Sequence, residues 1–438
     1  MKVALINLGC SKNLVDAEIM LGFLRKSGFA IKENPVGCDV AIVNTCAFIK
    51  DAKKEAIDTV FKLVNLKKHG KLKKIIVSGC LPQRYGKELA SLFEEVDGFL
   101  GTGNIDKIAA TIGNLFKNRQ VVNIGPNHYL YKHNTPRIYL TPEHYAYVKI
   151  ADGCDNGCSY CVIPQIRGVF RSRRMESILN EVRNMAERGI KEVNLISQDT
   201  TFYGYDIYKK YALEQLLKKL VKIKKLQWIR LLYLHPRHLN VSLLKVIRDE
   251  PKICRYIDLP IQHINDRILK SMKRKVKAAS IKKLIVDIRR IIPDSVLRTT
   301  LIVGFPQETE LEFRELYEYA ADVKFERLGV FTYSAEENTA AVLLKGQIPQ
   351  RIKNKRRDKL MRMQQKIVER SNAALVGRKM EVLIENIVGG GMASGRTQYD
   401  APDVDGLVYV KGKDLKVGSM ETVLITDNIL YDLTGEKV

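Results

Sequence analysis

Three cysteines, Cys154, Cys158 and Cys161, lie close together in the segment ADGCDNGCSYC. Their C-x3-C-x2-C spacing places three thiols in one loop, and no second closely spaced pair of cysteines follows. A structural zinc site uses four ligands, usually as two such pairs, so this spacing does not favour zinc. Three thiolates suit a 4Fe-4S cluster, whose fourth iron then stays open to a small ligand. The loop therefore predicts an iron–sulfur site with one open coordination position.

A second set of three cysteines, Cys10, Cys46 and Cys80, is spread over the first eighty residues. Each follows an apolar segment that predicts a strand, and these segments are 2–8, 39–45 and 73–79. Segments with helical periodicity alternate with them, at 16–28, 51–70 and 85–96, which predicts a parallel sheet covered by helices. Ligands of such sheets bind at the carboxyl ends of the strands, so we expect the three thiols to meet there. Core packing is the alternative for any one of them.

A second α/β series follows a proline- and asparagine-rich linker at 125–144. Its six predicted strands are 146–150, 192–198, 228–234, 256–261, 297–304 and 327–333. Helical segments such as 177–189 and 280–292 lie between them, which predicts a partial TIM-like barrel. The loop with three cysteines follows the first of these strands, on the face where such barrels carry their chemistry.

The 438 residues carry a formal net charge of +24, and 45% of them are hydrophobic. This composition excludes a disordered tail and fits two or three globular domains. No apolar run reaches the roughly 18 residues of a membrane span, and the N-terminus does not resemble a signal peptide, so we expect a cytoplasmic protein. The positive charge indicates a polyanionic partner. Basic runs at 270–277 and 353–362 fit either solvated helix faces or nucleic-acid contacts.

The motifs resemble those of a known family. CDNGCSYC is similar to the radical S-adenosylmethionine signature, with the aromatic Tyr160 before the last cysteine. LGCSKNLVDAE (8–18), together with Cys46 and Cys80, resembles the methylthiotransferases, which place a second three-cysteine domain before the radical barrel. The end of the chain looks like their small all-β TRAM domain. The resemblance implies an α/β protein of three units: a methylthiotransferase domain at 1–117, a radical core at 140–370 and a TRAM domain at 373–438.

Four segments favour the RimO type within that family: LGCSKNLVDAE, WIRLLYLHP (228–236), YIDLPIQHINDRILKSMKR (256–274) and GRTQYDAPDVDGLVYV (395–410). This type adds a methylthio group to the β-carbon of an aspartate of ribosomal protein uS12. The alternatives are a methylthiotransferase that acts on a transfer-RNA adenosine, and an iron–sulfur or zinc protein that binds RNA without catalysis. Gln307 departs from the pattern, because it replaces a glycine at a turn where we expect a left-handed backbone.

The resemblance also implies the cofactors, which are two 4Fe-4S clusters and S-adenosylmethionine. Cys154, Cys158 and Cys161 would bind S-adenosylmethionine through the open iron and form the 5′-deoxyadenosyl radical. Cys10, Cys46 and Cys80 would hold the cluster that presents the sulfur. One S-adenosylmethionine would donate the methyl group and another would form the radical.

Two further sets of residues are candidate binding sites. Ser197, Gln198 and Asp199 end a predicted barrel strand, where they could contact S-adenosylmethionine. Asp400, Asp403 and Asp405 lie in the last sixty residues, which carry 6 Lys/Arg and 10 Asp/Glu, a net charge of −4. Ribosomal proteins are generally basic, so we expect these aspartates to recruit uS12 by charge attraction, with turn capping as the alternative.

Overall fold

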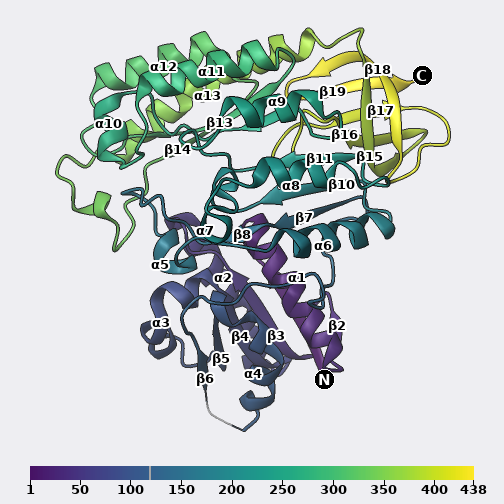
Figure 1. Ribbon diagram of the computed structural model, residues 1–438. Helices are drawn as coiled ribbons and strands as arrows, with labels where there is room; N and C mark the ends of the chain where they lie inside the picture. Colours follow the sequence, from purple (N-terminus) through teal and green to yellow (C-terminus); the bar gives the residue numbers. More distant parts are fainter. Residues whose placement is uncertain (118–119) are drawn as a thin grey trace.

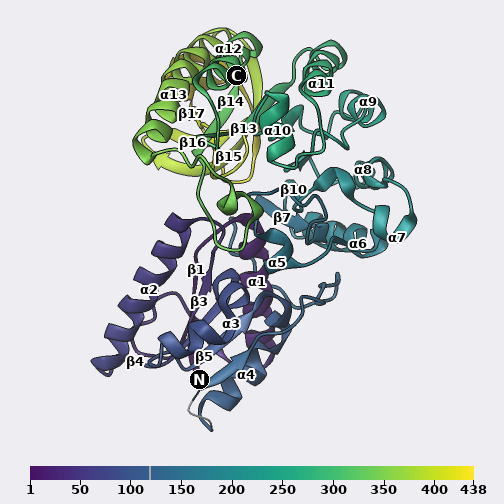
Figure 2. The same cartoon turned by 90° about the vertical axis from the view of Figure 1, so that its left-hand side faces the viewer.

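The structure is a computed structural model that describes residues 1–117 and 120–438. The chain forms three units in sequence order (Figure 1). The first unit lies below the central one in this view, and the last unit, in yellow, packs at its right. After a quarter turn the first unit still lies on one side of the central unit (Figure 2). The α/β class and the small all-β unit at the end confirm the predicted fold class.

The first unit is a six-stranded parallel sheet in the order β2-β1-β3-β4-β5-β6. Its strands are β1 (Lys2–Asn7), β2 (Ala30–Lys32), β3 (Cys38–Thr45), β4 (Leu72–Gly79), β5 (Gly98–Gly101) and β6 (Val121–Asn123). The helices are α1 (Ser11–Lys26), α2 (Lys50–Lys68), α3 (Cys80–Leu92) and α4 (Ile108–Leu115), with a 3-10 turn, η1 (Thr102–Lys107). Since β6 belongs to this sheet, the unit extends past residue 117, where we expected it to end.

The central unit contains the six expected strands, all in parallel pairs. They form two three-stranded sheets: β7 (Tyr145–Lys149), β10 (Glu192–Ile196) and β11 (Trp228–Leu231), then β12 (Tyr256–Asp258), β13 (Val296–Val303) and β14 (Arg327–Thr332). A parallel bridge between Ile229 and Ile253 lies where the two sheets adjoin. The arrangement is the predicted partial barrel, divided between its third and fourth strands.

Helices cover the outer side of this barrel. They are α6 (Met175–Glu187), α8 (Leu213–Leu220), α9 (Val241–Asp249), α10 (Asp266–Ser271), α11 (Ala278–Ile291), α12 (Glu310–Val323) and α13 (Gln350–Ala373). Their buried stripes pack on the strands through side chains such as Ile178, Leu216 and Ile281. Shorter elements lie at the loop end: α5 (Ile163–Arg167), η2 (Thr200–Phe202), α7 (Tyr205–Tyr208), η3 (Ala340–Leu343) and the strand pair β8 (Ala151–Asp152) and β9 (Arg171–Ser172).

The last unit is a closed barrel in the order β15-β16-β17-β19-β18. Its strands are β15 (Lys379–Gly389), β16 (Met392–Arg396), β17 (Val408–Lys411), β18 (Met420–Ile429) and β19 (Asp432–Lys437). Closure leaves no open sheet edge, and side chains such as Val382, Val410 and Ile425 fill the interior.

One hydrophobic cluster joins all three units. It contains Ile19 of α1, Trp228 of β11 and Leu383 of β15, each at most 4% exposed. Gln307 has a φ of 67°, as the turn predicted. Within the described residues, no helix combines the length and the hydropathy that a bilayer crossing requires.

Candidate functional site

The N-terminal cysteine site consists of Cys10, Cys46 and Cys80. Cys10 directly precedes α1, Cys46 directly follows β3, and Cys80 begins α3 directly after β4. The preceding strands β1, β3 and β4 are neighbours in the parallel sheet, so their carboxyl ends bring the three residues together as predicted. Burial raises the pKa of the Cys80 thiol to about 12, and Cys46 and Cys10 add to the rise while Arg167 opposes it.

The loop cysteine site consists of Cys154, Cys158 and Cys161, in the segment between β8 and α5. Its backbone is fixed by hydrogen bonds to distant segments: the amide of Cys154 donates to the carbonyl of Gly168, and that of Ser159 donates to the carbonyl of Met272. The three cysteines are partly buried, and burial raises the pKa of Cys154 to about 11.

Each site offers three free thiols, the ligand type that holds 4Fe-4S clusters. A structural zinc ion takes four protein ligands, one more than either set of three cysteines supplies. The donor set therefore suits one 4Fe-4S cluster, with one open iron, at each site.

A buried arginine lies beside each cysteine site. Nη1 of Arg274 is 3.7 Å from Sγ of Cys158, and Nη2 of Arg167 is 3.9 Å from Sγ of Cys80. The two arginines are 5% and 1% exposed. A guanidinium at this distance stabilises thiolates, which are the metal-binding form of cysteine.

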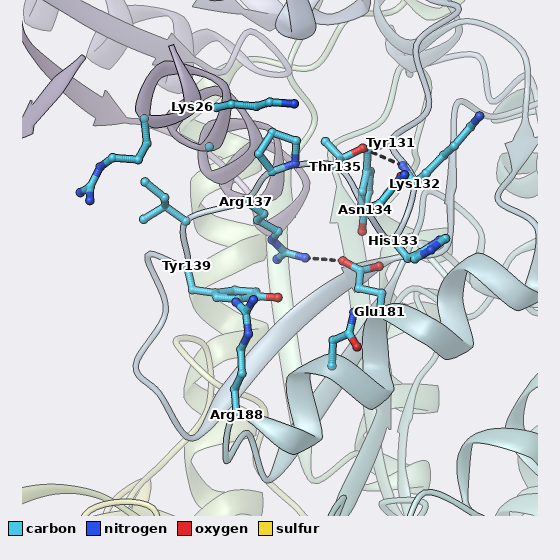
Figure 3. Close-up of a pocket in the computed structure, with 15 residues that line it drawn as sticks. Lys26, Tyr131, Lys132, His133, Asn134, Thr135, Arg137, Tyr139, Glu181 and Arg188 are labelled. Carbon is cyan, nitrogen blue, oxygen red and sulfur yellow. Dashed lines mark hydrogen bonds and ion pairs between the residues drawn. The ribbon is translucent and has the colours of Figure 1, made fainter. Parts of the chain in front are cut away.

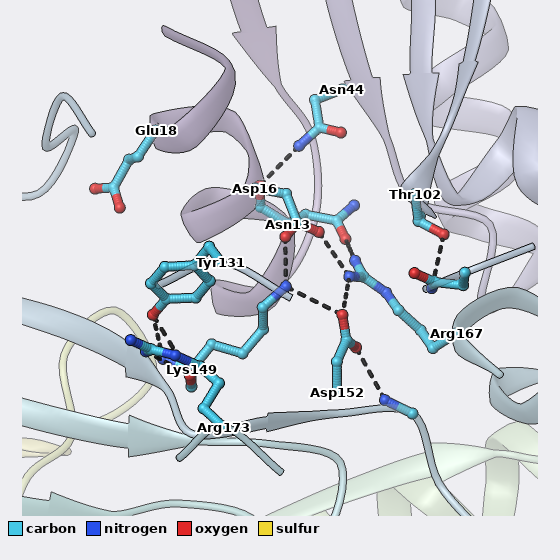
Figure 4. Close-up of polar contacts among 12 residues, drawn as sticks. Asn13, Asp16, Glu18, Asn44, Thr102, Tyr131, Lys149, Asp152, Arg167 and Arg173 are labelled. Carbon is cyan, nitrogen blue, oxygen red and sulfur yellow. Dashed lines mark hydrogen bonds and ion pairs between the residues drawn. The ribbon is translucent and has the colours of Figure 1, made fainter. Parts of the chain in front are cut away.

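An ionic network around Arg167 connects the first unit with the barrel (Figure 4). Nη1 of Arg167 donates to Asp16 at 2.6 Å and to Asp152 at 3.3 Å. Nζ of Lys149 donates to the same two carboxylates, at 2.5 and 3.1 Å. Asp16 belongs to α1, while the other three residues belong to the barrel unit. Charges buried this deeply require such pairing, because an unpaired one would carry a large desolvation cost.

The three residues expected to contact S-adenosylmethionine, Ser197, Gln198 and Asp199, differ in whether their side chains are free to bind a ligand. Ser197 is fully buried, and its hydroxyl accepts from the amide of Asp199. The carboxylate of Asp199 accepts from Asn156, His238 and Thr201, at 2.9, 2.8 and 2.6 Å. The side chain of Gln198, half-buried at the same strand end, makes no hydrogen bond within the described residues. Gln198 is therefore the available member of the set.

Asp199 instead supports the loop cysteine site. Its partner Asn156 lies between Cys154 and Cys158, so the carboxylate ties the loop to the end of β10. His238 and His235 complete a buried group whose ligand atoms lie within 4.8 Å of those of Asp199. Nδ1 of His235 accepts from the amide of Arg237, which places the proton on Nε2. This tautomer leaves Nε2 a donor without a partner rather than a metal ligand.

Asp400, Asp403 and Asp405, which we expected to recruit uS12, have hydrogen-bond partners within the protein. Asp400 accepts from Arg327 at 2.5 Å, and Asp405 accepts from the Tyr256 hydroxyl at 2.5 Å. Asp403 accepts from the Tyr147 hydroxyl at 3.1 Å. All three partners lie on barrel strands: Arg327 begins β14, Tyr256 begins β12 and Tyr147 lies in β7. These carboxylates therefore anchor the last unit to the amino ends of the strands. This end is opposite the cysteine loop. Asp400 is buried there, while Asp403 remains exposed.

A cavity of about 500 Å³ lies away from both cysteine sites, between α1 and α6 (Figure 3). Basic side chains such as Lys132 and Arg188 line it, and Arg137 within it donates to Glu181 at 2.8 Å. No cysteine lines this cavity, and it is separate from the candidate site.

Sequence reasoning missed Arg167 and Arg274, although both lie in segments with a visible signal. Arg167 follows the cysteine motif within RGVFRSR, where several arginines stand close to an apolar stretch. Arg274 belongs to the basic run 270–277, for which a solvated face or a nucleic-acid contact was expected. Its burial against Cys158 corrects that interpretation for this one residue.

Comparison with family models divides the chain in the same order as the structure. The Uncharacterized protein family UPF0004 matches residues 2–101, the Radical SAM superfamily matches 148–320, and the TRAM domain matches 376–438.

Curated relatives match over the full length. The chain is 47% identical to the ribosomal protein uS12 methylthiotransferase RimO of Pelotomaculum thermopropionicum, over 100% of this chain and 99% of the relative. It is 46% identical to the protein of the same name from Clostridioides difficile, over 100% and 98%.

Among solved structures, the chain is similar to the radical S-adenosylmethionine methyltransferase TsrM from Kitasatospora setae, solved with cobalamin and a 4Fe-4S cluster bound. The TM-score is 0.57 at 12% identity, over 76% of this chain and 74% of TsrM. This likeness concerns the fold.

Proposed function

The chain belongs to the RimO family of ribosomal protein uS12 methylthiotransferases, and from this premise we propose that it transfers a methylthio group to the β-carbon of an aspartate of uS12. The observation that carries the proposal is the pairing of two three-cysteine sites from different units across one interface. Arg167 touches Cys80 on one side, and the backbone of Gly168 holds Cys154 on the other. An enzyme that forms a radical at one centre and supplies sulfur from another needs such a pair.

Two 4Fe-4S clusters would occupy these sites, one on Cys10, Cys46 and Cys80 and one on Cys154, Cys158 and Cys161. When bound, the clusters and S-adenosylmethionine supply the radical that removes a hydrogen atom from the aspartate and the sulfur and methyl group that replace it. The protein supplies position and exclusion of water. Arg167 and Arg274 hold positive charge against the thiolates, and Asp199 holds the cysteine loop through Asn156.

The free amide of Gln198 would contact the polar end of S-adenosylmethionine at the mouth of the barrel. The corresponding roles of Ser197 and Asp199 are to hold this strand end and the cysteine loop in place. We place the reaction in the cytoplasm, because the proposed substrate is a ribosomal protein.

The test is anaerobic reconstitution with iron and sulfide, followed by incubation with S-adenosylmethionine, a reductant and one substrate. Unmodified uS12 and unmodified transfer RNA are compared by mass spectrometry. We expect a methylthio mass gain on an aspartate-containing peptide of uS12. A gain on transfer-RNA adenosine alone would contradict the proposal and favour the nucleic-acid enzyme.

A further inference from the structure

The guanidinium of Arg167 spans the gap between the two cysteine sites. On one side Nη2 lies 3.9 Å from Sγ of Cys80. On the other side Nη1 donates to Asp152, two residues before Cys154. The side chain is 1% exposed, so surrounding atoms confine it to this position. A single planar group therefore contacts Cys80 of one site and Asp152, two residues before Cys154 of the other. Figure 4 shows Arg167 with Asp152 and with Asp16 of α1.

The contacts of Arg167 extend to the rest of the N-terminal cysteine site. Nη2 also donates to the side-chain oxygen of Asn13, and Nδ2 of Asn13 donates to the carbonyl of Thr45 at 2.8 Å. Thr45 directly precedes Cys46. Gly9, which precedes Cys10, leaves no room for a side chain, because a Cβ there would lie 2.9 Å from Nδ2 of Asn13. Arg167 thus contacts Cys80 directly, and Asn13 links it to the residues that precede Cys46 and Cys10.

The backbone next to Arg167 fixes the loop cysteine site. The carbonyl of Gly168 accepts from the amide of Cys154 at 3.1 Å. Gly153 has a φ of 79°, and a Cβ at this position would lie 2.0 Å from the carbonyl oxygen of Val169. The turn before Cys154 therefore packs so closely against the turn after Arg167 that no side chain fits between them.

The network holds its four charges in balance. Lys149 and Arg167 are cationic, Asp16 and Asp152 are anionic, and all four residues are at most 3% exposed. These charges cancel over the network as a whole, so the network adds geometry to the local positive charge that Arg167 places beside Cys80. Its contribution is geometric, since the fork of an arginine fixes direction as well as distance.

We propose that Arg167 is a positioning residue that sets the separation and orientation of the two cysteine sites. The inference rests on the proposed function, in which one site must deliver sulfur to a carbon activated at the other. Reacting atoms must approach to about 3–3.5 Å, and a displacement of about 1 Å costs roughly 100-fold in rate. Arg167 can set this distance because it contacts Cys80 at one site and Asp152 beside the other.

Arg137 is a matched control. It is also a buried arginine that joins α1 to the barrel, with ion pairs to Glu18 at 2.5 Å and to Glu181 at 2.8 Å. None of its contacts in the described residues involves a cysteine. A lysine at either position keeps the positive charge but loses the fork, so R167K and R137K weaken the interface alike.

The experiment compares wild type, R167K and R137K as full-length reconstituted enzymes with equal iron content. The electron paramagnetic resonance spectrum of the doubly reduced protein reports the magnetic coupling between the two clusters. We expect R167K to change this coupling and R137K to retain it. We also expect the ratio of methylthiolated uS12 to 5′-deoxyadenosine to fall by about 100-fold in R167K alone.

Unchanged coupling and an unchanged product ratio in R167K would overturn the inference. Equal changes of the coupling and of the product ratio in R167K and R137K would also overturn it. Both arginines would then act only by stabilising the interface. Failure of the proposed function has another signature: wild type would then give no methylthio product on uS12, while the coupling measurement would still report the role of Arg167.

A separate observation concerns the exposed face of α13. Six cations recur there at intervals of three or four residues and form one basic stripe: Arg351, Lys355, Lys359, Arg362, Lys366 and Arg370. All six are exposed, and within the described residues none of them forms an ion pair with an acidic side chain. The opposite face packs on the barrel through residues such as Leu360 and Val368. Lys359 also lies over the ring of Tyr317, at 4.6 Å from its centroid, so the test below leaves this lysine unchanged.

The stripe runs between two functional regions over about 29 Å, at 1.5 Å per residue. Near its start, Nζ of Lys353 donates to the carbonyl of Tyr333 at the carboxyl end of β14, on the cysteine-loop side of the barrel. Near its end, Asn372 donates to the carbonyl of Leu430 in the last unit. A ligand along the stripe would extend from the active-site face to the TRAM domain.

We infer that this stripe binds the phosphate backbone of small-subunit ribosomal RNA, so that the enzyme engages uS12 within the ribosomal subunit. The inference rests on the proposed function for the identity of the substrate. RNA fits because its phosphates present repeated negative charge along a line, as the stripe presents positive charge.

The test neutralises five stripe residues at once, as R351Q, K355Q, R362Q, K366Q and R370Q. A matched control neutralises five exposed lysines around α8: Lys218, Lys219, Lys222, Lys224 and Lys225. Binding to unmodified small subunits is measured against salt concentration. We expect the slope of log K against log salt to fall by roughly four in the stripe variant, since each phosphate contact contributes about 0.7–0.9.

The control variant should retain the wild-type slope, and both variants should bind free uS12 like wild type. Equal slopes for wild type and the stripe variant would overturn the inference. A loss of affinity for free uS12 in the stripe variant would overturn it too, because the stripe would then bind protein. These binding measurements do not depend on catalysis, so they remain informative if the proposed function fails.

Discussion

Nη1 of Arg274 lies 3.7 Å from Sγ of Cys158, and Nη2 of the same guanidinium donates to the carbonyl of Pro260 at 2.6 Å. The charge is buried and rigidly held next to a cluster ligand. Nearby charge and hydrogen bonds to the sulfurs set the reduction potential of an iron–sulfur cluster.

Replacement of Arg274 by glutamine should lower the reduction potential of the cluster on the loop cysteine site. Loss of a nearby positive charge makes electron addition less favourable, so S-adenosylmethionine cleavage should slow by about tenfold, as a barrier increase of roughly 1.4 kcal/mol would produce. A redox titration followed by electron paramagnetic resonance measures the potential, and chromatography measures 5′-deoxyadenosine. R267Q is the control, because Arg267 is an exposed residue of α10 paired with Glu312. Equal potentials in R274Q and wild type would refute this prediction.

Removal of either cysteine set should halve the iron from about eight to about four per chain, since each set holds one 4Fe-4S cluster. Alanine at Cys154, Cys158 and Cys161 should abolish 5′-deoxyadenosine formation. Alanine at Cys10, Cys46 and Cys80 should leave this cleavage detectable and abolish methylthiolation. Iron analysis and product quantification check both outcomes, and one tightly bound zinc with no iron uptake would contradict the assignment.

Asp199 and Gln198 should give opposite phenotypes. Asparagine at Asp199 replaces one acceptor oxygen by an amide that faces the donors Asn156, His238 and Thr201. The lost hydrogen bonds should lower the stability of this region by about 1–3 kcal/mol. D199N should therefore release iron faster from the loop cysteine site. Q198A should keep its iron and bind S-adenosylmethionine more weakly, as measured by equilibrium dialysis. Normal iron retention in D199N with weakened S-adenosylmethionine binding would restore Asp199 as a direct contact.

Asp400 should stabilise the protein rather than recruit a substrate. D400N leaves Arg327 buried without its partner carboxylate, and breaking a buried pair costs about 3 kcal/mol of unfolding free energy. Thermal unfolding and proteolysis near residues 373–379 should both reveal looser attachment of the last unit. Wild-type stability combined with weakened uS12 binding would favour the original recruitment hypothesis.

Acid should loosen the same interface. Burial favours a higher pKa for Glu192, but Arg396 and Arg230 outweigh it and hold the pKa below the ordinary 4.5. For Glu385, burial is outweighed in the same way by His144 and Arg396. Because the folded pKa values are depressed, their stabilisation is present above about pH 4.5 and is lost as the pH falls through the folded values.

Calorimetry across this acidic range should show a steeper loss of stability in wild type than in E385Q. Asp405 acts in the opposite direction, since burial raises its pKa, so the difference between the two proteins isolates Glu385. Parallel pH profiles for wild type and E385Q would exclude this contribution.

The strands and the cysteine positions could be predicted because they depend on local pattern. Apolar runs such as 39–45 predicted buried strands, and Cys46 had to follow the carboxyl end of that strand. The supporting residues depend on long-range contacts that no local pattern contains. Arg167 meets Cys80 across 87 positions, and Arg274 meets Cys158 across 116.

Charge was the least reliable guide to position. Asp400 was expected to attract uS12 by its charge, but it is buried and accepts from Arg327, which lies 73 residues away in the sequence. In α1 the polar residues Asn13, Asp16 and Glu18 are buried against the barrel. Sequence patterns ordinarily assign such polar residues to the solvent-exposed face of a helix. Such residues become predictable only when their partners in another unit are known.

The hydrophobic cluster that contains Ile19, Trp228 and Leu383 also constrains how the chain is made. A ribosome releases the residues in order, so α1 emerges long before the strand that carries Leu383. Until that strand arrives, part of the apolar surface of α1 and of the barrel stays exposed to solvent. Folding during synthesis can complete the sheet of the first unit early. The shared core can form only when the nascent chain is nearly finished. Folding of the last unit is therefore the step that covers this apolar surface and protects the protein from aggregation.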